Sequence, residues 1–440
     1  MRTSFITLFG MFLIASSGWA ADVPTAKNAP SESVTTPSDQ WKLTAATDFR
    51  YFSWHSDRGY PTSIALANVR GSGSEIYIPY ALQLVGRPID DIKVEILGRG
   101  GRVRATQSTV GLAGEVKTTT DTVANATVTY FGLNGVQPFA SVAFNFPTGK
   151  SALYGTAANA RMDPDLVEIS SFGEGFNVGP TFGFNVPITS DLIASASIGY
   201  TQRGSFTREK SLTPVDPNAQ ASSIIDPGQV LTFTGSLGAQ LGSLTTKITG
   251  AVSTETDTKV DGLATFRPGR RYVVTGEFGY TWPEQWGTTS LTASFSHTRS
   301  NKVLFTDMHT LDPIALDTEP FNSNANTYLV NFQHLFPIGP FWIGPLASYL
   351  NRNHNGYNSA TLQFVPAKER RTVGLLAQIA ANDRISLNAR LERVWTHVAD
   401  DSFDNKTSLI LIPNSIIPGS GVPPISGTGW QFSGGINLTF

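Results

Sequence analysis

The feature that most limits the fold of this chain is a rhythm of connection lengths. About sixteen segments alternate apolar and polar residues, which is the period-2 pattern of a strand with one apolar and one polar face. Between these segments, short turns and long polar loops alternate strictly along the chain. A soluble sandwich has no reason to sort its loops in this way, whereas an outer-membrane barrel has short turns at one end and long loops at the other.

The segments have the length that a tilted membrane-spanning strand needs, about 9 to 11 residues. The sequence therefore predicts an all-β fold, a transmembrane antiparallel up-and-down β-barrel of about sixteen strands; two weakly apolar segments, 120–132 and 243–254, leave fourteen or twelve open. The predicted strands lie near residues 41–54, 75–85, 90–98, 120–132, 135–146, 174–187, 191–203, 229–241, 243–254, 271–282, 288–299, 326–336, 341–350, 371–381, 384–396 and 429–440.

Composition excludes several other classes of protein. The chain has no cysteine, which rules out a disulfide scaffold, a thiolate zinc site and a cysteine nucleophile. Charged residues make up 15% of the chain and the formal net charge is -2, so no basic surface for nucleic acid is indicated. No run of about 18 apolar residues follows the N-terminal region, which argues against a membrane protein built of helices.

The N-terminal residues predict export. Arg2 precedes an apolar stretch at 6–15, and Gly18-Trp19-Ala20 offers small residues for cleavage before Ala21, which is the pattern of a secretory signal peptide. We expect three parts: a signal peptide at 1–20, a flexible periplasmic tether at 21–40 and the barrel with its long external loops at 41–440. Export through the Sec pathway to the outer membrane of a Gram-negative bacterium follows from this reading.

Two stretches carry a resemblance to known families. The alternating ending from Trp430-Gln431-Phe432 to Leu438-Thr439-Phe440 resembles the terminal strand of bacterial outer-membrane barrels, including porins. That resemblance implies that Phe440 is read by the barrel-assembly machinery and that outer-membrane lipids surround the barrel. The stretch 144–150, Phe-Asn-Phe-Pro-Thr-Gly-Lys, followed by a Gly-rich strand at 174–187, is similar to the outer-membrane transporters linked to meta-pathway phenol degradation.

Strand parity predicts where charges face the lumen. Neutral residues fill most inward positions, whereas the charges collect on strands that closure would place side by side. This charged wall either binds and filters solutes, as charged rings do in pores, or is a salt-bridged lining that stiffens the barrel. Its predicted members are Lys42, Asp48, Arg50, Glu75, Asp91, Lys93, Glu95, Arg384, Arg390 and Glu392.

Two further lumen features are predicted. Leu329, Trp342, Leu346 and Leu376 form an inward apolar stripe, unless a local bulge exchanges the two faces. The third long loop, 147–173, is the one that folds inward as a constriction in the general porins that this chain resembles in size. Its candidate residues are Lys150, Arg161, Asp163, Asp165 and Glu168.

The apolar segment 408–425 either caps the barrel mouth, packs into the lumen or forms a subunit contact, since it is too apolar to stand free in water. Catalysis is weighed on His297, which lies near Ser296 and Ser300 as in a barrel lipase, and on Asp307 with His309 as in an omptin-like protease. Both signals are weak, so we expect no enzyme, no cofactor and no metal.

The sequence therefore predicts an outer-membrane channel for passive or facilitated passage of small solutes, with aromatic or amphipathic compounds as candidates. The alternative is a non-channel barrel whose long external loops bind a partner or a surface, as adhesins do; a barrel lipase or protease ranks third. The expected partners are small-molecule solutes, membrane lipids and the assembly machinery, without nucleic acid, and the oligomeric state stays open.

Overall fold

The computed structural model describes residues 41–56, 71–109, 112–209, 222–283, 286–306, 313–357, 364–399 and 424–440. The predicted signal peptide, the tether, most of the apolar segment 408–425 and the pair Asp307 and His309 lie outside these residues. The described chain is almost wholly β, with one 3-10 turn at Gly155–Ala160. No helix in the described ranges is long and apolar enough to cross a membrane.

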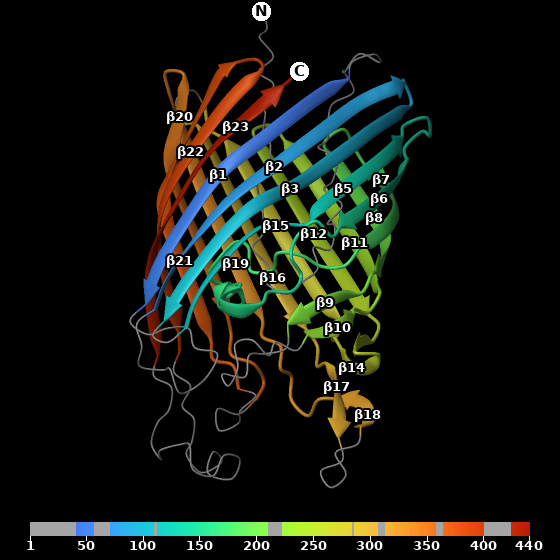
Figure 1. Cartoon of the computed structure of the whole chain (residues 1–440). Helices are drawn as coiled ribbons and strands as arrows, with labels where there is room; N and C mark the ends of the chain where they lie inside the picture. Colours follow the sequence, from blue (N-terminus) through green and yellow to red (C-terminus); the bar gives the residue numbers. More distant parts are fainter. Residues whose placement is uncertain are drawn as a thin grey trace, which may run out of the picture.

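The strands form a closed antiparallel barrel (Figure 1). The main sheet has 17 strands, but β4 pairs only with the outer part of β3, so sixteen strands close the ring. In order around the barrel they are β1 (Lys42–Ser56), β2 (Gly71–Ile89), β3 (Ile92–Thr109), β5 (Thr122–Tyr130), β6 (Gln137–Phe146), β7 (Asn177–Pro187), β8 (Leu192–Arg203), β11 (Val230–Leu241), β12 (Leu244–Glu255), β15 (Arg271–Thr281), β16 (Thr288–Thr298), β19 (Thr327–Ile338), β20 (Phe341–Arg352), β21 (Lys368–Asn382), β22 (Ile385–Val398) and β23 (Ile425–Thr439).

Each strand matches one predicted segment, so the predicted all-β fold and the count of sixteen are confirmed. The ring closes where β1 pairs with β23, from Thr44 opposite Thr439 to Ser56 opposite Gly427. Backbone hydrogen bonds between Leu43 and Phe440, 3.2 and 2.9 Å long, extend this seam. Closure leaves no unpaired edge among the sixteen strands of the ring, which is the condition for a sheet in lipid.

Loop length is sorted between the two ends of the barrel, as the sequence predicts. The tight turns lie at the end that also holds the beginning of β1 and the end of β23 (Figure 1). Gly242 and Gly339 take positive φ values of 61° in two of these turns, a conformation that favours glycine. We call this the turn end and the opposite end the loop end.

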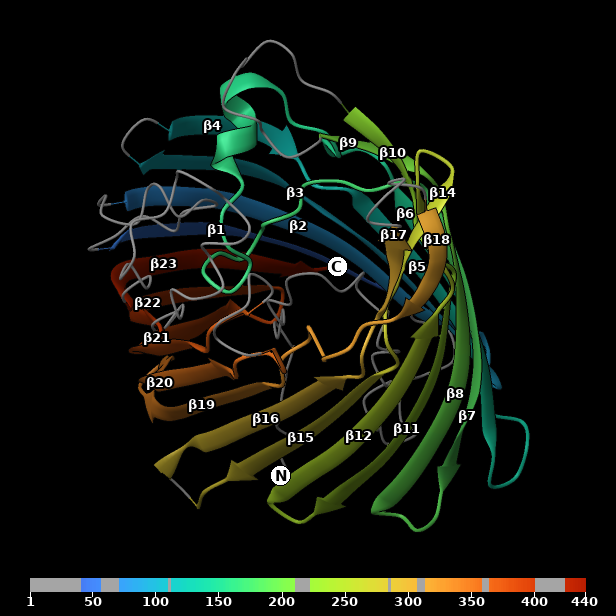
Figure 2. The same cartoon turned by 90° about the horizontal axis from the view of Figure 1, so that it is seen from below.

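The long connections add structure beyond the loop end. β4 (Leu112–Thr119) continues the line of β5 along β3. A separate six-stranded sheet joins β9 (Phe206–Glu209), β10 (Ser222–Asp226), β13 (Thr258–Val260), β14 (Leu263–Arg267), β17 (Lys302–Thr306) and β18 (Pro313–Thr318). Figure 2 shows this sheet at one side of the barrel mouth.

The outward face of the barrel is apolar. Cross-strand pairing carries one face from strand to strand, and most of the large apolar side chains exposed on the strands lie on that outward face, as in the row Leu391, Phe432 and Tyr51. Aromatic rings gather near both ends of the strands. Near the loop end, the Arg393 guanidinium lies 5.0 Å from the Trp430 ring centre. An apolar band with aromatic girdles is the surface that lipid requires.

Two members of the predicted charged wall are misplaced. Asp91 precedes β3 and Arg384 precedes β22, and both are exposed residues of tight turns. The parity argument fails for them because alternation between faces holds only within a strand, and these positions reverse the chain. Lys42 keeps the inward parity but lies exposed at the rim of the turn end.

Candidate functional site

The connection between β6 and β7, residues 147–176, runs inside the barrel; we call it the inner loop (Figure 2). Its two ends are held together by Asp121, which lies in the break between β4 and β5. The Asp121 carboxylate accepts hydrogen bonds from the amides of Gly149 at 2.9 Å and Glu174 at 2.7 Å, and from Asn145 Nδ2 at 2.8 Å. One carboxylate thus fixes both stems of the loop.

Glycine is required at the stem because the two ends pass very close to each other. A Cβ placed on Gly149 would lie 1.8 Å from the carbonyl oxygen of Phe172. Hydroxyl groups reinforce the same junction, since Thr119 Oγ1 donates to the Thr148 carbonyl at 2.6 Å. Any side chain at Gly149 would force the stems apart.

The underside of the inner loop is an apolar surface that packs on the barrel wall. Leu153, Met162, Leu166, Val167 and Phe172 are buried in one cluster with inward residues of the strands. The wall side of this cluster comprises Phe52, Trp54, Tyr77, Val103, Ala105, Val116 and Val394. Trp54 Nε1 also lies 3.1 Å from Met162 Sδ, so this wall residue both packs and donates. Apolar burial is therefore the main force that holds the loop to the wall.

An ion pair and a hydrogen bond join the inner loop to β1 and β2. Arg50 pairs with Glu168 and, at 2.9 Å, with Asp48 on its own strand. Glu75 accepts the amide of Ile169 at 3.2 Å, and its side chain is buried. Burial raises the pKa of the Glu168 carboxyl above its usual range, and the facing Arg50 charge offsets this only in part. The inner loop thus places the Glu168 carboxylate beside Arg50, a base that the sequence analysis predicts on the charged wall.

A second set of ion pairs joins the inner loop to β20 and β21. Lys368 pairs with Asp163 and lies 3.4 Å from Asp165, and Arg352 lies 3.1 Å from Asp165. These strands lie across the ring from the stems, because seven strand steps separate β7 from β20 in one direction and seven separate β6 from β21 in the other. The loop therefore reaches the far side of the ring by running along the wall, past β3, β2, β1 and β22 to β21 and β20.

Behind the inner loop, the wall carries further paired charges. Arg390 lies 2.7 Å from Glu392, whose side chain is 1% exposed, and Arg370 donates to Gln431 at 3.1 Å. The Arg370 guanidinium also lies 5.5 Å from the Phe52 ring centre. We call the inward faces of β1, β2, β20, β21 and β22 the basic wall.

At the loop end, Glu209 of β9 anchors the start of the inner loop. It pairs with Arg161 and accepts the Leu153 amide at 2.9 Å. Partial burial acts to raise the pKa of Glu209, but the hydrogen bonds from Arg161 and Leu153 outweigh it and lower the pKa below its usual range. Lys150, the remaining candidate in this loop, is exposed.

The rest of the predicted charged wall lies on inward positions. Lys93 is buried on β3, and Glu95 accepts a hydrogen bond from Gln83 Nε2 at 2.6 Å. Two residues that parity predicts to face inward, Arg50 and Glu75, contact the inner loop. Sequence reasoning missed Asp121, Glu209, Arg352, Lys368 and Arg370, which make the contacts described above.

The four stripe residues share the inward face. Leu346 and Leu376 form a buried cluster with Leu335, a residue that the sequence analysis missed. Leu329 pairs with Leu350 across β19 and β20, and Trp342 is 38% exposed toward the turn end. The pairing of β20 with β21 is continuous from Phe341 to Arg352, so the alternative of a bulge that exchanges faces is not found there.

The opposite half of the barrel has a different lining. The inward faces of β7, β8, β11, β12, β15 and β16, which we call the hydroxyl wall, present mainly small neutral groups. Six examples are Ser195, Ser197, Thr234, Ser236, Thr275 and Thr292. Arg203 pairs with Glu255 at 2.7 Å near its loop end, and Lys247 lies directly opposite Glu277.

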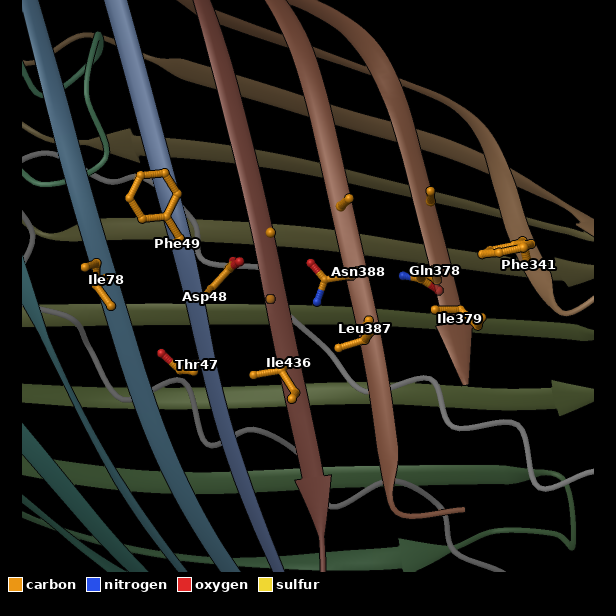
Figure 3. Close-up of a pocket in the computed structure, with 14 residues that line it drawn as sticks. Thr47, Asp48, Phe49, Ile78, Phe341, Gln378, Ile379, Leu387, Asn388 and Ile436 are labelled. Carbon is orange, nitrogen blue, oxygen red and sulfur yellow. The ribbon is translucent and has the colours of Figure 1, made fainter. Parts of the chain in front are cut away.

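A shallow apolar cavity of about 570 Å³ is lined by β1, β2 and β20 to β23 (Figure 3). Most of its lining residues, such as Phe49, Leu387 and Ile436, belong to the outward face, so it faces the membrane side of the wall. A Cβ on Gly435 would lie 2.8 Å from both Asp48 Oδ1 and Asn388 Nδ2, so glycine lets these two inward groups approach each other.

The catalytic alternative gains no support from the described residues. His297 Nδ1 lies 2.8 Å from Asn326 Oδ1, and its ring stacks on Tyr272. Ser296 precedes it on the same strand and therefore points to the other face of the sheet. Among the described residues, no group of three or more His, Asp or Glu side chains is placed to hold a metal ion.

A closed sixteen-stranded barrel with an apolar exterior and a long loop folded into its lumen is a porin-like architecture. No family model and no curated protein matches the sequence. Among solved structures, the chain is similar to the outer-membrane channel OccK1 (OpdK) of Pseudomonas aeruginosa, at 11% identity and a TM-score of 0.41, covering 91% of this chain and 99% of that one.

Two other channels are similar at the same level. The COG4313 outer membrane channel from Pseudomonas putida F1 matches at 9% identity and a TM-score of 0.38, covering 94% of this chain and 99% of that one. The CymD monoaromatic hydrocarbon channel matches at 11% identity and a TM-score of 0.37, covering 92% of this chain and 89% of that one. These values are too low to transfer a neighbour's solute to this chain.

Proposed function

We propose that this protein is a channel in the outer membrane of a Gram-negative bacterium, through which small solutes cross passively. The observation that carries the proposal is the inner loop, which is held by ion pairs and apolar packing against the basic wall. Barrels of 16 to 18 strands enclose an aqueous lumen. A loop fastened to one side of such a lumen narrows it to a constriction.

The solute path runs between the inner loop and the hydroxyl wall. The loop uses most of its carboxylates and apolar side chains against the basic wall, so the face it turns toward the path has few groups left to bind a solute tightly. Weak binding suits passive passage, because a solute that binds strongly in a pore leaves it slowly. The exposed Trp342 adds an apolar contact for amphipathic solutes near the turn end.

Conductance in planar bilayers tests the proposal. The purified full-length barrel is inserted from detergent, and we expect stepwise increases in current of uniform size at constant voltage. Insertion is verified independently by the slower migration of the unfolded chain after boiling. Protein that inserts as a folded barrel and gives neither current steps nor solute flux into liposomes would show that the lumen is closed.

A binding role for the external loops is the second candidate. The six-stranded sheet beyond the loop end exposes Ile224, Leu263 and Phe305, a set of apolar side chains that lies outside any membrane. Adhesion of cells that produce the protein is compared with that of cells producing a variant in which these three residues are serine. Loss of adhesion with unchanged solute flux would favour the binding role over the channel.

A further inference from the structure

We propose that the channel passes uncharged polar solutes and discriminates little between anions and cations, because the inner loop neutralises the basic wall. This inference rests on the proposed channel function and names its solute class. It concerns the acidic side chains of the loop as a set: Asp163, Asp165 and Glu168 are all turned toward the wall and contact bases there.

The part of the basic wall that lies behind the inner loop has more positive than negative side chains of its own. Its five bases are Arg50, Arg352, Lys368, Arg370 and Arg390, and its three carboxylates are Asp48, Glu75 and Glu392. The strands alone therefore carry a formal excess of two positive charges. The three loop carboxylates reverse this excess to a single negative charge, so the wall and loop together are close to neutral.

The pairing is local as well as numerical. The contacts Lys368 to Asp163, Arg352 to Asp165 and Arg50 to Glu168 each join a loop carboxylate to a base within salt-bridge distance. Charges paired this closely present a dipole rather than a net charge to a passing ion, and the field of a dipole falls off faster with distance. A ring of uncompensated charged side chains is one way in which a pore prefers cations or anions, and this arrangement compensates the charges of the wall.

The hydroxyl wall supplies the complementary property. Its charges are few: Arg203 pairs with Glu255, Lys247 faces Glu277, and Arg271 is a further base at the loop end of β15. Hydroxyl groups both donate and accept hydrogen bonds. A solute that carries hydroxyl or amide groups can therefore exchange its bonds to water for bonds to this wall, whereas an ion meets mostly neutral or oppositely paired groups along it.

The reversal potential in a salt gradient measures this directly. For the wild-type channel we expect cation and anion permeabilities that agree within about twofold, as in pores without a charged ring. The double variant Asp163→Asn with Asp165→Asn leaves Lys368 and Arg352 without their carboxylates, and we expect anion permeability to rise several-fold relative to cation permeability. The converse variant, Lys368→Gln with Arg352→Gln, should shift selectivity toward cations.

Asp257→Asn is the matched control, because Asp257 pairs with Arg267 in the connections beyond the loop end, and not in the lumen. It should leave the permeability ratio unchanged. A wild-type channel with clear conductance and strong preference for one sign of ion would overturn the inference while leaving the channel function intact. Shifts of the same sign in the two double variants would also overturn it. Absence of conductance in the wild type would instead refute the channel function.

Discussion

Asp121→Ala should release the inner loop from the barrel. The variant removes the acceptor for the amides of Gly149 and Glu174 and for Asn145, three hydrogen bonds of 2.7 to 2.9 Å. A hydrogen bond to a charged group contributes about 1.5 to 3 kcal/mol, and the lower value applies to a junction that is only partly buried. Loss of the two backbone bonds then costs about 3 kcal/mol of stem stability.

A loss of about 3 kcal/mol raises the population of the detached loop on the order of 100-fold. Hydrogen exchange of the amides between Leu153 and Phe172 should accelerate by a similar factor, since these residues are protected by packing on the wall. Single-channel current should become noisier and larger on average. Asp121→Asn, which keeps one acceptor oxygen, should give an intermediate effect.

Asp191→Ala is the control for this experiment, because Asp191 is an exposed residue in a tight turn at the other end of the barrel. Equal exchange rates in the Asp121 and Asp191 variants would show that the stem is held by strand pairing and the close glycine contact alone. The reasoning that one carboxylate fixes both stems would then be wrong.

Two further predictions concern the same loop. Arg50→Met leaves Glu168 and Asp48 without their base, and breaking a partly buried pair in this way should destabilise the docked loop by about 3 kcal/mol. The loss should be seen as faster hydrogen exchange at 160–172. Arg104→Met, which breaks an exposed pair with Glu115, should leave exchange at 160–172 unchanged. Burial raises the pKa of docked Glu168, so the docked loop binds a proton more readily than a detached loop does. Docking should therefore be strongest in acid. It should weaken as pH rises from the ordinary glutamate pKa, about 4.3, through the raised pKa of the docked state. Current noise measured against pH should follow this course, and Glu168→Gln should abolish the dependence; a dependence that survives in this variant would assign it to another group.

The strands of this barrel are predictable because their signal is distributed. Each of the segments carries several alternating residues, so a single ambiguous position does not move the strand, and the lengths of the connections fix which end each strand points to. Parity alone places Arg50, Glu75 and Glu392 inward, because pleating sets the side-chain direction within a strand. Asp91 and Arg384 fail because the period gives no information on where a strand ends.

The contacts of the inner loop are not predictable in the same way. Lys368 meets Asp163 across 205 residues of sequence, and no local pattern marks such a pair. Asp121 lies in a stretch that reads as one weak strand, 120–132, whereas the chain breaks there because Asp121 turns to the loop stems rather than to a neighbouring strand. Without glycine or proline, the break is marked only by threonines and Asp121, a weaker signal than the alternation around it.

The path of the inner loop also has a mechanical consequence. It is fastened to β6 and β7 at Asp121 and to β20 and β21 through Lys368 and Arg352, on opposite sides of the ring. The loop ties together the strands of the arc from β3 to β20 on their inner face, so a force that separates these strands is carried in part by the ion pairs at its far end.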